Sequence, residues 1–482
     1  MSETITITKL NEVHCRVQCD AGIAAELQDY FSFYVPGYKF MPKFRSGAWD
    51  GKIRLFNPFG KVIYGGLINK IQEFAQVREY EVEIENQLLP RPFSFKEAED
   101  FANSLGLPEH IESREHQLEG FAHCVREGRA LLLSPTSSGK SLIIYLLTKY
   151  YNCKVLVITP SIGLVGQMKG DFEEYGADPE DIHAVSAGVS KVSEKGIWVS
   201  TWQSLTKMPK SFFDQFGMIL VDEAHLADAK SLTTILEKAE NTPHRFGCTG
   251  TLDGSLTHEL VLRGLFGPMK KVITTKEMID KGYAAKLKIK CVVLKWGDDD
   301  RKVLSKAAYK DEIDWVVTNE KRNKFIRNLA LSLDGNVLIL YRFVEKQGMV
   351  LRDMIEAATD RPVHYIDGGV DGDARNVIRK EVDEVEDSIT VASYGTSATG
   401  MSVKNFNYLI FASPSKGRIR NLQSIGRMLR ISKKKNSAEL IDIADDLSWK
   451  NKKNHTLGHF KERLKQYDSE EHNYRIYPID MS

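Results

Sequence analysis

Residues 131–141, LLLSPTSSGKS, join an apolar run to a loop of small residues, and an apolar run that suits a helix follows directly. Strand, loop and helix in this order are the context in which a G-K-S sequence binds phosphate. The loop's backbone N–H groups surround the anion, Lys140 reaches the outer phosphates, and the Ser141 hydroxyl ligates Mg²⁺. A chance G-K-S in a surface turn is the alternative, and the flanking strand and helix argue against it.

The acid pair Asp222 and Glu223 follows the four apolar residues MILV. At the end of a strand, one carboxylate can hold Mg²⁺ through water while its neighbour positions and deprotonates an attacking water. Acids also favour helix N-termini, which is the structural alternative. The phosphate loop about 80 residues upstream favours the catalytic interpretation.

Short apolar runs alternate with helical patterns from residue 111 to about 275, which predicts a parallel sheet covered on both faces. The expected strands are ALLLS, KVLVITP, IWVSTW, GMILVDEAH and RFGCTGT. Their carboxyl ends carry the candidate residues, as in open α/β sheets. The alternation resumes from about 284 to 446 without a second phosphate loop, so we expect this second lobe to complete a site on the first.

The sequence QSIGRMLR places Arg427 and Arg430 three residues apart, on one face of a predicted helix. Surface salt bridges are the ordinary role of such a pair. In a lobe that completes a nucleotide site, planar guanidinium groups suit the charge that develops on a γ-phosphate.

Residues 1–90 read as a separate small α+β module. The sequences ITITKL and VHCRVQC predict strands, and GIAAELQDYFSFY predicts a helix. Between further strands, PGYKFMPKFRSGAWDGKIRLF interleaves aromatic with basic residues, among them Lys39, Lys43, Arg45 and Trp49. This composition suits stacking on bases and contact with phosphates. Packing of the aromatics in the module's own core is an equal alternative.

The whole chain has 482 residues and a net charge of +1, so about three domains are expected and bulk charge does not identify a partner. Residues 416–465, however, hold 14 basic and 5 acidic residues, which predicts a phosphate-facing surface or a solvated basic tail. No apolar run is long enough to span a membrane, the start is polar, and six scattered cysteines suit reduced thiols, so we expect a cytoplasmic protein. The expected divisions are an N-terminal α+β domain (1–90), a linker or docking helix (91–110), lobe 1 (111–278), lobe 2 (279–448) and a basic helical tail (449–482).

In order along the chain, the motifs resemble the series of a superfamily 2 DEAH-type helicase. They are REHQ, SPTSSGKS, TPSIGLVGQ, TWQS, VDEAH, TGT, YGTSATGMSVKN and QSIGRMLR. The sequence FRSGAWDGKIRLF and the short lobes further resemble the UvsW-like recombination and repair helicases of tailed phages. The resemblance implies two RecA-like doubly wound parallel-sheet lobes in tandem behind the N-terminal α+β domain, with ATP and Mg²⁺ as cofactors.

The resemblance also implies roles for single residues. Gln117 would read adenine, Ser141 and Asp222 would hold Mg²⁺, and Lys140, Glu223, Arg427 and Arg430 would be catalytic. Thr249 and Thr251 would couple hydrolysis to lobe movement. The implied nucleotide contacts are Gln117, Ser134, Pro135, Thr136, Ser137, Ser138, Gly139, Lys140, Ser141, Asp222, Glu223, Gly400, Gln423, Arg427 and Arg430. The implied nucleic-acid contacts are Ser161, Gln167, Thr201, Gln203 and Thr396, beside the four residues of the N-terminal module. Ser134 and Ser402 depart from the usual pattern, and Ser402 puts a ribose contact in doubt.

The function expected from these observations is ATP-dependent unwinding or branch migration of DNA forks, Holliday junctions or D-loops in phage replication, recombination and repair. An RNA helicase, a motor subunit without autonomous unwinding, and a clamp that binds ATP without turnover are the alternatives. Glu223 argues against a clamp, which needs no water-activating carboxylate. Recombination or single-strand-binding proteins are the expected partners. A monomer is expected because one chain supplies both lobes.

Overall fold

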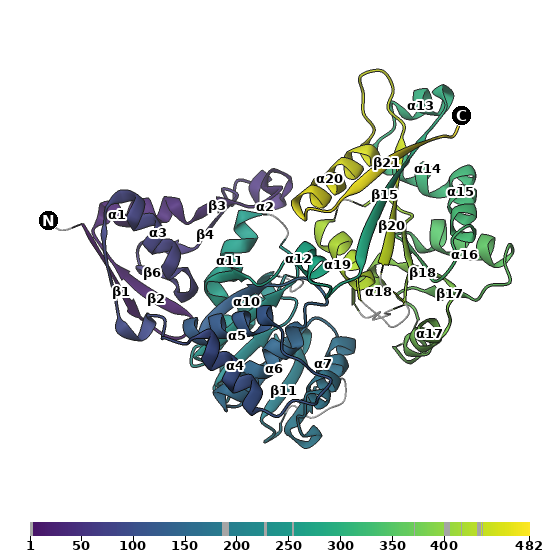
Figure 1. Cartoon of the computed structure of the whole chain (residues 1–482). Helices are drawn as coiled ribbons and strands as arrows, with labels where there is room; N and C mark the ends of the chain where they lie inside the picture. Colours follow the sequence, from purple (N-terminus) through teal and green to yellow (C-terminus); the bar gives the residue numbers. More distant parts are fainter. Residues whose placement is uncertain are drawn as a thin grey trace. The chain divides into compact units, whose positions relative to one another are not determined.

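The computed structural model describes residues 3–185, 192–225, 229–252, 255–370, 372–399, 405–415, 417–430, 435 and 437–482. The chain divides into two compact units, Met1–Ser134 with Gly139–Val272 and Pro135–Ser138 with Ile273–Ser482 (Figure 1). The first unit contains the N-terminal module and the first lobe.

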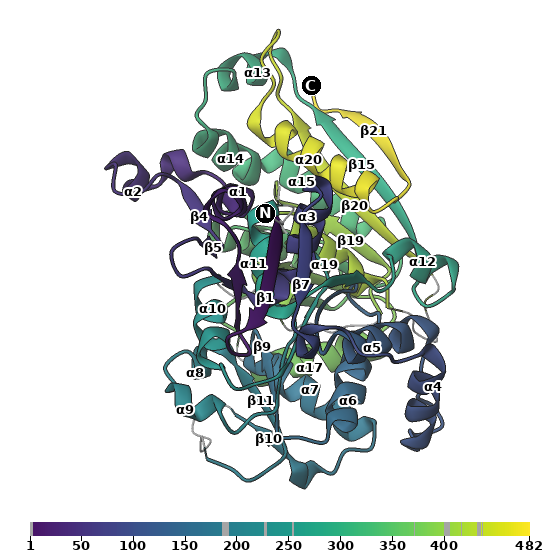
Figure 2. The same ribbon diagram turned by 90° about the vertical axis from the view of Figure 1, so that its left-hand side faces the viewer.

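The N-terminal module is a five-stranded mixed sheet in the order β5-β6-β2-β1-β7, packed against α1 and α3. In β1, TITITK, the alternate residues Ile5 and Ile7 are fully buried. Strand β1 pairs antiparallel with β2 and parallel with β7, and Figure 2 shows β1 and β7 side by side. The elements are β1 Thr4–Lys9, β2 His14–Gln18, α1 Ala21–Tyr30, β3 Ser32–Tyr34, η1 Tyr38–Phe40, α2 Pro42–Arg45, β4 Lys52–Arg54, β5 Phe56–Asn57, β6 Val62–Tyr64, η2 Gly65–Leu67, α3 Ile68–Arg78, β7 Glu81–Ile84 and η3 Asn86–Leu88.

The helix predicted over GIAAELQDYFSFY is too long. Helix α1 ends at Tyr30, and Ser32–Tyr34 forms β3, which pairs antiparallel with β4 in a separate two-stranded ribbon. Phe31 is fully buried in the module's core at the point where the chain changes from helix to strand. Helix α2 lies at the far end of this ribbon and projects from the rest of the module (Figure 2).

The first lobe contains seven parallel strands in the order β10-β11-β9-β12-β13-β8-β14. Parallel pairing aligns the strands so that their carboxyl ends share one edge, with Thr249 opposite Leu133 and Thr201 opposite Thr159. The elements are α4 Phe95–Ser104, α5 Glu115–Glu127, β8 Arg129–Leu133, α6 Lys140–Tyr151, β9 Val155–Thr159, α7 Ile162–Glu174, η4 Pro179–Asp181, β10 Ile182–Ala184, β11 Ile197–Thr201, α8 Trp202–Leu205, α9 Lys210–Phe213, β12 Met218–Val221, α10 Ala229–Lys238, β13 His244–Thr249, α11 Leu256–Phe266 and β14 Met269–Lys271.

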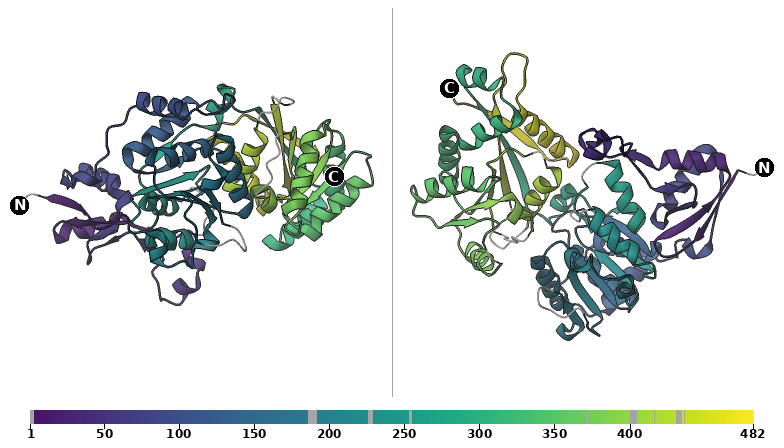
Figure 3. Two further views of the ribbon diagram at one scale, coloured as in Figure 1. Left: turned by 90° about the horizontal axis from the view of Figure 1, so that it is seen from below. Right: turned by 180° about the vertical axis from the view of Figure 1, so that it is seen from behind.

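Both faces of this sheet are apolar, which explains the nearly continuous hydrophobic runs in the sequence. Leu132 and Leu220 point into a cluster with residues of α5, α6 and α7, whereas Leu131 and Val221 point into a cluster with α8, α10 and α11. Helices accordingly cover the two faces (Figure 3). Helix α4, in the segment expected to be a linker or docking helix, buries Ala98 in the first of these clusters.

The second unit contains another seven-stranded parallel sheet, in the order β17-β18-β16-β19-β20-β15-β21. Its two faces also bury separate apolar clusters. The predicted fold class, two parallel-sheet lobes with a small N-terminal α+β domain, is therefore confirmed. The elements are α12 Thr275–Asp280, β15 Lys286–Lys295, α13 Asp298–Leu304, α14 Tyr309–Thr318, α15 Glu320–Leu331, β16 Val337–Tyr341, η5 (a π-helix) Val344–Gly348, α16 Met349–Glu356, β17 Val363–Ile366, α17 Gly372–Glu384, β18 Ile389–Ser393, α18 Tyr394–Thr399, β19 Tyr408–Phe411, α19 Arg418–Met428, β20 Ser437–Asp446, α20 His455–Ser469 and β21 Tyr474–Asp480.

The prediction of a basic tail from residue 449 is wrong, because this segment is part of the second lobe. Strand β21 adds an edge strand by pairing with β15 along its whole length. Helix α20 is fixed by Arg463, whose guanidinium donates to both carboxylate oxygens of Asp442 at 2.7 to 3.0 Å, with both side chains almost fully buried. The Tyr467 hydroxyl donates to the same carboxylate at 2.8 Å.

All six cysteines are free thiols. Over the described ranges, none of the helices combines the length and the apolar character that crossing a membrane requires.

Substituting Arg463 with Met should destabilise the second lobe by about 3 to 5 kcal/mol, since it leaves the Asp442 carboxylate buried without its cation. Urea unfolding followed by circular dichroism measures this. Lys465→Met is the matched control on the same helix: its ion pair with Glu462 is exposed, so the loss should stay below about 1 kcal/mol. Equal losses in the two variants would contradict the structural role of the buried pair.

Candidate active site

The nucleotide residues of the first lobe gather where three neighbouring strands end. Strands β12, β13 and β8 are adjacent, so Asp222, Thr249 and Ser134 leave the same edge of the sheet. The Ser134 N–H donates to the Thr249 carbonyl at 2.8 Å, which ties the start of the phosphate loop to the end of β13. Parallel strand pairing thus brings Ser134 close to Asp222 and Thr249, which follow it in the sequence by 88 and 115 positions.

Gly139 ends the phosphate loop and precedes α6. Its φ of 81° is in the left-handed region, and a Cβ atom there would lie 2.0 Å from Gln117 Nε2. That amide donates to the Gly139 carbonyl at 3.2 Å, and Gln117 Oε1 accepts from the Arg114 N–H at 2.8 Å. Gln117, predicted to read adenine, is therefore held directly against the loop. Ser134 and Ser138 are buried there, and the Ser138 hydroxyl donates to the Pro135 carbonyl.

Lys140 lies between the loop and the acid pair. Its Nζ atom is 3.2 Å from the Ser134 carbonyl oxygen and 3.5 Å from Glu223 Oε1. Burial lowers the pKa of Lys140, but the carboxylates of Glu223 and Asp222 outweigh burial, so the pKa is raised and the ammonium stays charged. Glu223 has a φ of 50°, a left-handed backbone that costs a residue with a Cβ about 1 kcal/mol. Such strain is typical of functional positions.

Asp222 fits a cation site. Burial, together with the charge of Glu223, raises the pKa of its carboxyl to about 7. Its Oδ1 atom is buried and has no hydrogen-bond partner among the residues that the structure describes. A buried carboxylate oxygen without a donor is stabilised by a nearby positive charge, and Mg²⁺ prefers oxygen ligands. The donor set is therefore compatible with the predicted Mg²⁺ site.

Two residues beside this site carried no predicted role. His225 Nδ1 contacts the Thr249 hydroxyl and lies 3.4 Å from Glu223 Oε2. Burial lowers the pKa of His225 to about 4, so the ring is neutral at pH 7. The Thr249 hydroxyl donates its only proton to the Thr251 carbonyl at 2.8 Å, and the ring Nδ1–H is then the donor to Thr249. The only signal for His225 in the sequence was its place in VDEAH.

Tyr175 is the second residue beside the site without a predicted role, and no sequence motif indicated it.

The predicted nucleic-acid contacts of the first lobe lie at the ends of the next two strands. Ser161 follows β9 and caps α7, and Thr201 ends β11, which pairs with β9. Gln167 and Gln203 are exposed, whereas Thr201 is buried. The nucleotide residues therefore follow β8, β13 and β12, whereas the predicted nucleic-acid residues lie at or beyond the ends of β9 and β11, with Gln167 on α7 and Gln203 on α8.

The aromatic-basic stretch of the N-terminal module forms an arm, residues 34–54, around the β3–β4 ribbon. None of residues 34–50 is buried, and Phe40 is 76% exposed. Tyr38 stacks on Tyr34 at 4.6 Å and meets Phe44 edge-on, so the tip is held by its own rings. The Trp49 indole N–H donates to the Lys52 carbonyl. The aromatics of the tip thus do not serve the module's core. The packing alternative is correct for Phe56 at the end of the stretch, which is buried in that core.

In the second unit, Arg427 belongs to α19 and Arg430 follows its C-terminal end. Thr396 is buried on α18, where its hydroxyl donates to the Ser393 carbonyl at 3.0 Å. Gly400 and Ser402 lie outside the described residues, as does the side chain of Gln423.

Not all of the basic residues counted between 416 and 465 lie on the surface. Arg463 is buried against Asp442, and the Lys435 ammonium is buried and donates to the Phe406 and Met428 carbonyls. Composition does not distinguish such internal cations from those on the surface. Lys416, Lys433 and Lys434 lie outside the described residues.

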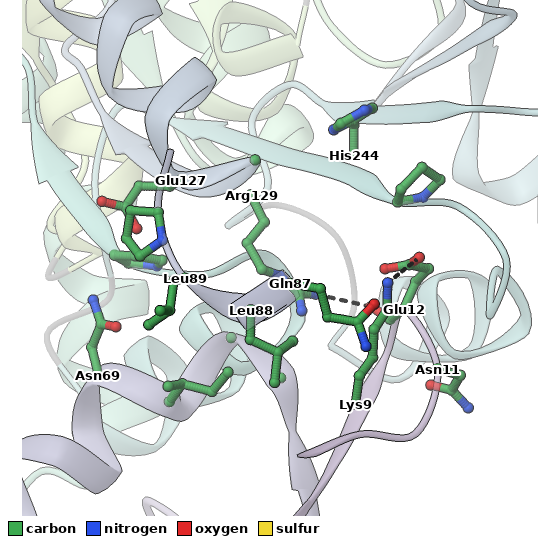
Figure 4. Close-up of a pocket in the computed structure, with 17 residues that line it drawn as sticks. Lys9, Asn11, Glu12, Asn69, Gln87, Leu88, Leu89, Glu127, Arg129 and His244 are labelled. Carbon is green, nitrogen blue, oxygen red and sulfur yellow. Dashed lines mark hydrogen bonds and ion pairs between the residues drawn. The ribbon is translucent and has the colours of Figure 1, made fainter. Parts of the chain in front are cut away.

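A cavity of about 190 Å³ lies where the N-terminal module meets the first lobe. Figure 4 shows Lys9, Glu12 and Gln87 from the module, and Arg129 and His244 from the lobe, around it. None of the predicted site residues lines this cavity, so it marks the junction of the two parts rather than the nucleotide site.

Comparison with known proteins gives matches over both parts of the first unit. Residues 5–85 match the family model for the N-terminal domain of the DNA helicase UvsW, and residues 104–254 match the model for the res subunit of type III restriction enzymes. The ATP-dependent DNA helicase UvsW of Enterobacteria phage T4 is 33% identical over 97% of this chain and 98% of its own. The crystal structure of T4 UvsW covers all of both chains with a TM-score of 0.53 at 32% identity. A putative HsdR fragment of a type I restriction enzyme from Vibrio vulnificus, at 16% identity, covers 86% of this chain and 83% of its own with a TM-score of 0.58, and shows the fold alone.

Two parallel-sheet lobes with a phosphate loop and an acid pair on the first suit a nucleotide-driven motor, and the matches to UvsW and to the res subunit identify a helicase of superfamily 2. Similarity over nearly the whole chain narrows the assignment. The chain belongs to the UvsW family of ATP-dependent DNA helicases.

Substituting Gly139 with Ala should cost at least about 1 kcal/mol of unfolding free energy, because the φ of 81° and the Gln117 amide both oppose a Cβ atom. Chemical denaturation without nucleotide measures this loss. Gly170→Ala is the control: Gly170 lies inside α7 with open space around it, so the change should be neutral or stabilising by up to about 1 kcal/mol. A neutral Gly139→Ala would contradict this geometry of the loop.

Proposed function

We propose that the chain hydrolyses ATP to translocate on DNA, and that it unwinds or branch-migrates forks, Holliday junctions and D-loops in phage replication, recombination and repair. The observation that carries the proposal is the arrangement of the first lobe. The nucleotide residues follow β8, β13 and β12, and the exposed candidates for strand contact, Gln167 and Gln203, lie on α7 and α8, the helices that follow β9 and β11. Family membership supports DNA as the substrate.

At the nucleotide, Lys140 and the N–H groups of residues 134–141 bind phosphates, and Gln117 recognises adenine. Ser141 and Asp222 hold Mg²⁺, which when bound neutralises phosphate charge. Glu223 positions and deprotonates the attacking water. Its separation of 3.5 Å from Lys140 supports this role, since it places a positive charge beside the carboxylate that would accept the water's proton. Arg427 and Arg430 stabilise the charge that develops on the γ-phosphate.

Coupling to lobe movement runs through Thr249 and Thr251. The contacts from Glu223 to His225, from His225 to Thr249, and from Thr249 to Thr251 support this assignment. A change at the carboxylate can then reach the segment that follows β13 through the His225 ring and the Thr249 hydroxyl, which donates to the Thr251 carbonyl.

A branched substrate is supported by the arm. Lys39, Lys43 and Arg45 are exposed beside Phe40, so the tip can neutralise phosphates and stack on an unpaired base at a branch. The remaining elements of the proposal are a monomer in the host cytoplasm, recombination or single-strand-binding proteins as partners, and domain limits at residues 90, 110 and 278.

Steady-state ATP hydrolysis tests the function. We expect four-way junctions and forks to stimulate more than single-stranded DNA, duplex or RNA, with Lys140→Ala inactive throughout. Glu223→Gln should bind ATP like the unmodified protein and lose at least about 100-fold in turnover. Strongest stimulation by RNA would favour the RNA-helicase alternative. No stimulation at all would favour a partner-dependent motor.

Removing the arm's charges, Lys39, Lys43 and Arg45 to Ala together, should weaken junction binding and reduce the slope of log affinity against log salt by about 0.9 for each lost phosphate contact. Phe40→Ala should weaken binding by about 1 to 3 kcal/mol with the slope unchanged, because stacking releases no counterions. Fluorescence anisotropy over a salt series gives both quantities. Lys70→Ala, on α3 of the same module, is the control. An unchanged slope in the triple variant would exclude the arm from the DNA interface.

A further inference from the structure

Tyr175 is the residue directly after α7, and its hydroxyl lies 2.9 Å from Ser141 Oγ. Ser141 is the second residue of α6 and the proposed Mg²⁺ ligand of the phosphate loop. The two residues are 34 positions apart, so no local motif indicates the pair.

The position of the Tyr175 hydroxyl is fixed by helix packing. The Tyr175 N–H donates to the Asp171 carbonyl at 3.0 Å, which completes the last turn of α7. Its ring packs against Tyr145, one turn along α6 from Ser141, with ring centroids 5.5 Å apart. Tyr145 also packs against Phe172 of α7 at 5.5 Å. The interface between α6 and α7 therefore holds the phenol beside Ser141.

A serine hydroxyl has one proton and two lone pairs. As a metal ligand it must direct a lone pair at the cation and its proton at an acceptor elsewhere. The Tyr175 oxygen is such an acceptor within hydrogen-bond distance. A phenol, unlike a carboxylate, adds no formal negative charge next to the phosphate site.

We propose that Tyr175 is a positioning residue, which accepts the Ser141 proton and so orients the Ser141 lone pair toward the Mg²⁺ of the bound nucleotide. This inference rests on the proposed function, because it needs Ser141 as a metal ligand. Groups that orient metal ligands typically change metal affinity when they are removed.

The test is nucleotide binding rather than turnover. The full chain and its Tyr175→Phe variant are titrated with a fluorescent ADP, once with Mg²⁺ and once with EDTA. With Mg²⁺, we expect the variant's Kd to rise about 3- to 10-fold, because one hydrogen bond is lost. In EDTA, the Kd should stay within about twofold of the value for the unmodified chain. Equal weakening under both conditions, or no weakening with Mg²⁺, would overturn the proposal.

Tyr145→Phe is the matched control, since it removes a hydroxyl from the same ring pair without touching Ser141. Its affinities should be unchanged, and thermal unfolding of both variants checks folding. In a Ser141→Ala background, Tyr175→Phe should have no further effect, and a further Mg²⁺-specific loss there would also overturn the proposal. If Ser141→Ala keeps the full Mg²⁺-dependent gain in affinity, the metal role of Ser141 in the proposed function fails. If Ser141→Ala loses that gain and Tyr175→Phe keeps it, only the role of Tyr175 fails.

Discussion

The main-chain hydrogen bond from Ser134 to Thr249 joins the two strands on which the nucleotide site depends. It continues the parallel ladder of β8 and β13 by one residue, into the phosphate loop. The loop therefore starts from a fixed point, and the left-handed Gly139 turns it into α6 at the Gln117 side chain. Asp222 reaches the same edge because β12 pairs with β13. The pairing of these three strands thus brings together site residues that are far apart in the sequence.

The site's electrostatics follow from its burial. Lys140, Asp222 and Glu223 are all at most slightly exposed, and one ammonium faces two carboxyl groups. An unpaired buried charge is costly, and one ammonium cannot balance two carboxylates. The pKa of Asp222 is therefore raised. A divalent cation bound there would provide the missing positive charge. The same burial keeps His225 neutral, which lets it act as a hydrogen-bond donor to Thr249 rather than as a second cation.

Periodicity predicted the two parallel sheets because their strands are buried on both faces and read as short continuous apolar runs, such as MILV before Asp222. The phosphate loop and the acid pair could be predicted because each directly follows a short apolar run that indicates a buried strand. The failures share a physical cause. Strand β21 is largely exposed, so YRIYPID lacks the continuous apolar run of a strand buried on both faces, and its pairing with β15 depends on a distant strand. Arg463 resembled surface charge because its partner, Asp442, lies on another element. Tyr175 reaches Ser141 only through the packing of α6 on α7.

The N-terminal module is built onto the first lobe rather than tethered to it. Gly66 packs so closely against α11 that a Cβ atom would lie 2.1 Å from the Arg263 carbonyl oxygen. The Tyr64 hydroxyl donates to Glu237 at 2.6 Å, and the Arg129 guanidinium donates to the Glu12 carbonyl at 3.1 Å. Leu260 of α11 belongs to the module's own apolar cluster. Since these contacts bury both surfaces, the module and the first lobe behave as one body. The arm therefore belongs to the same compact unit as Lys140 and Glu223.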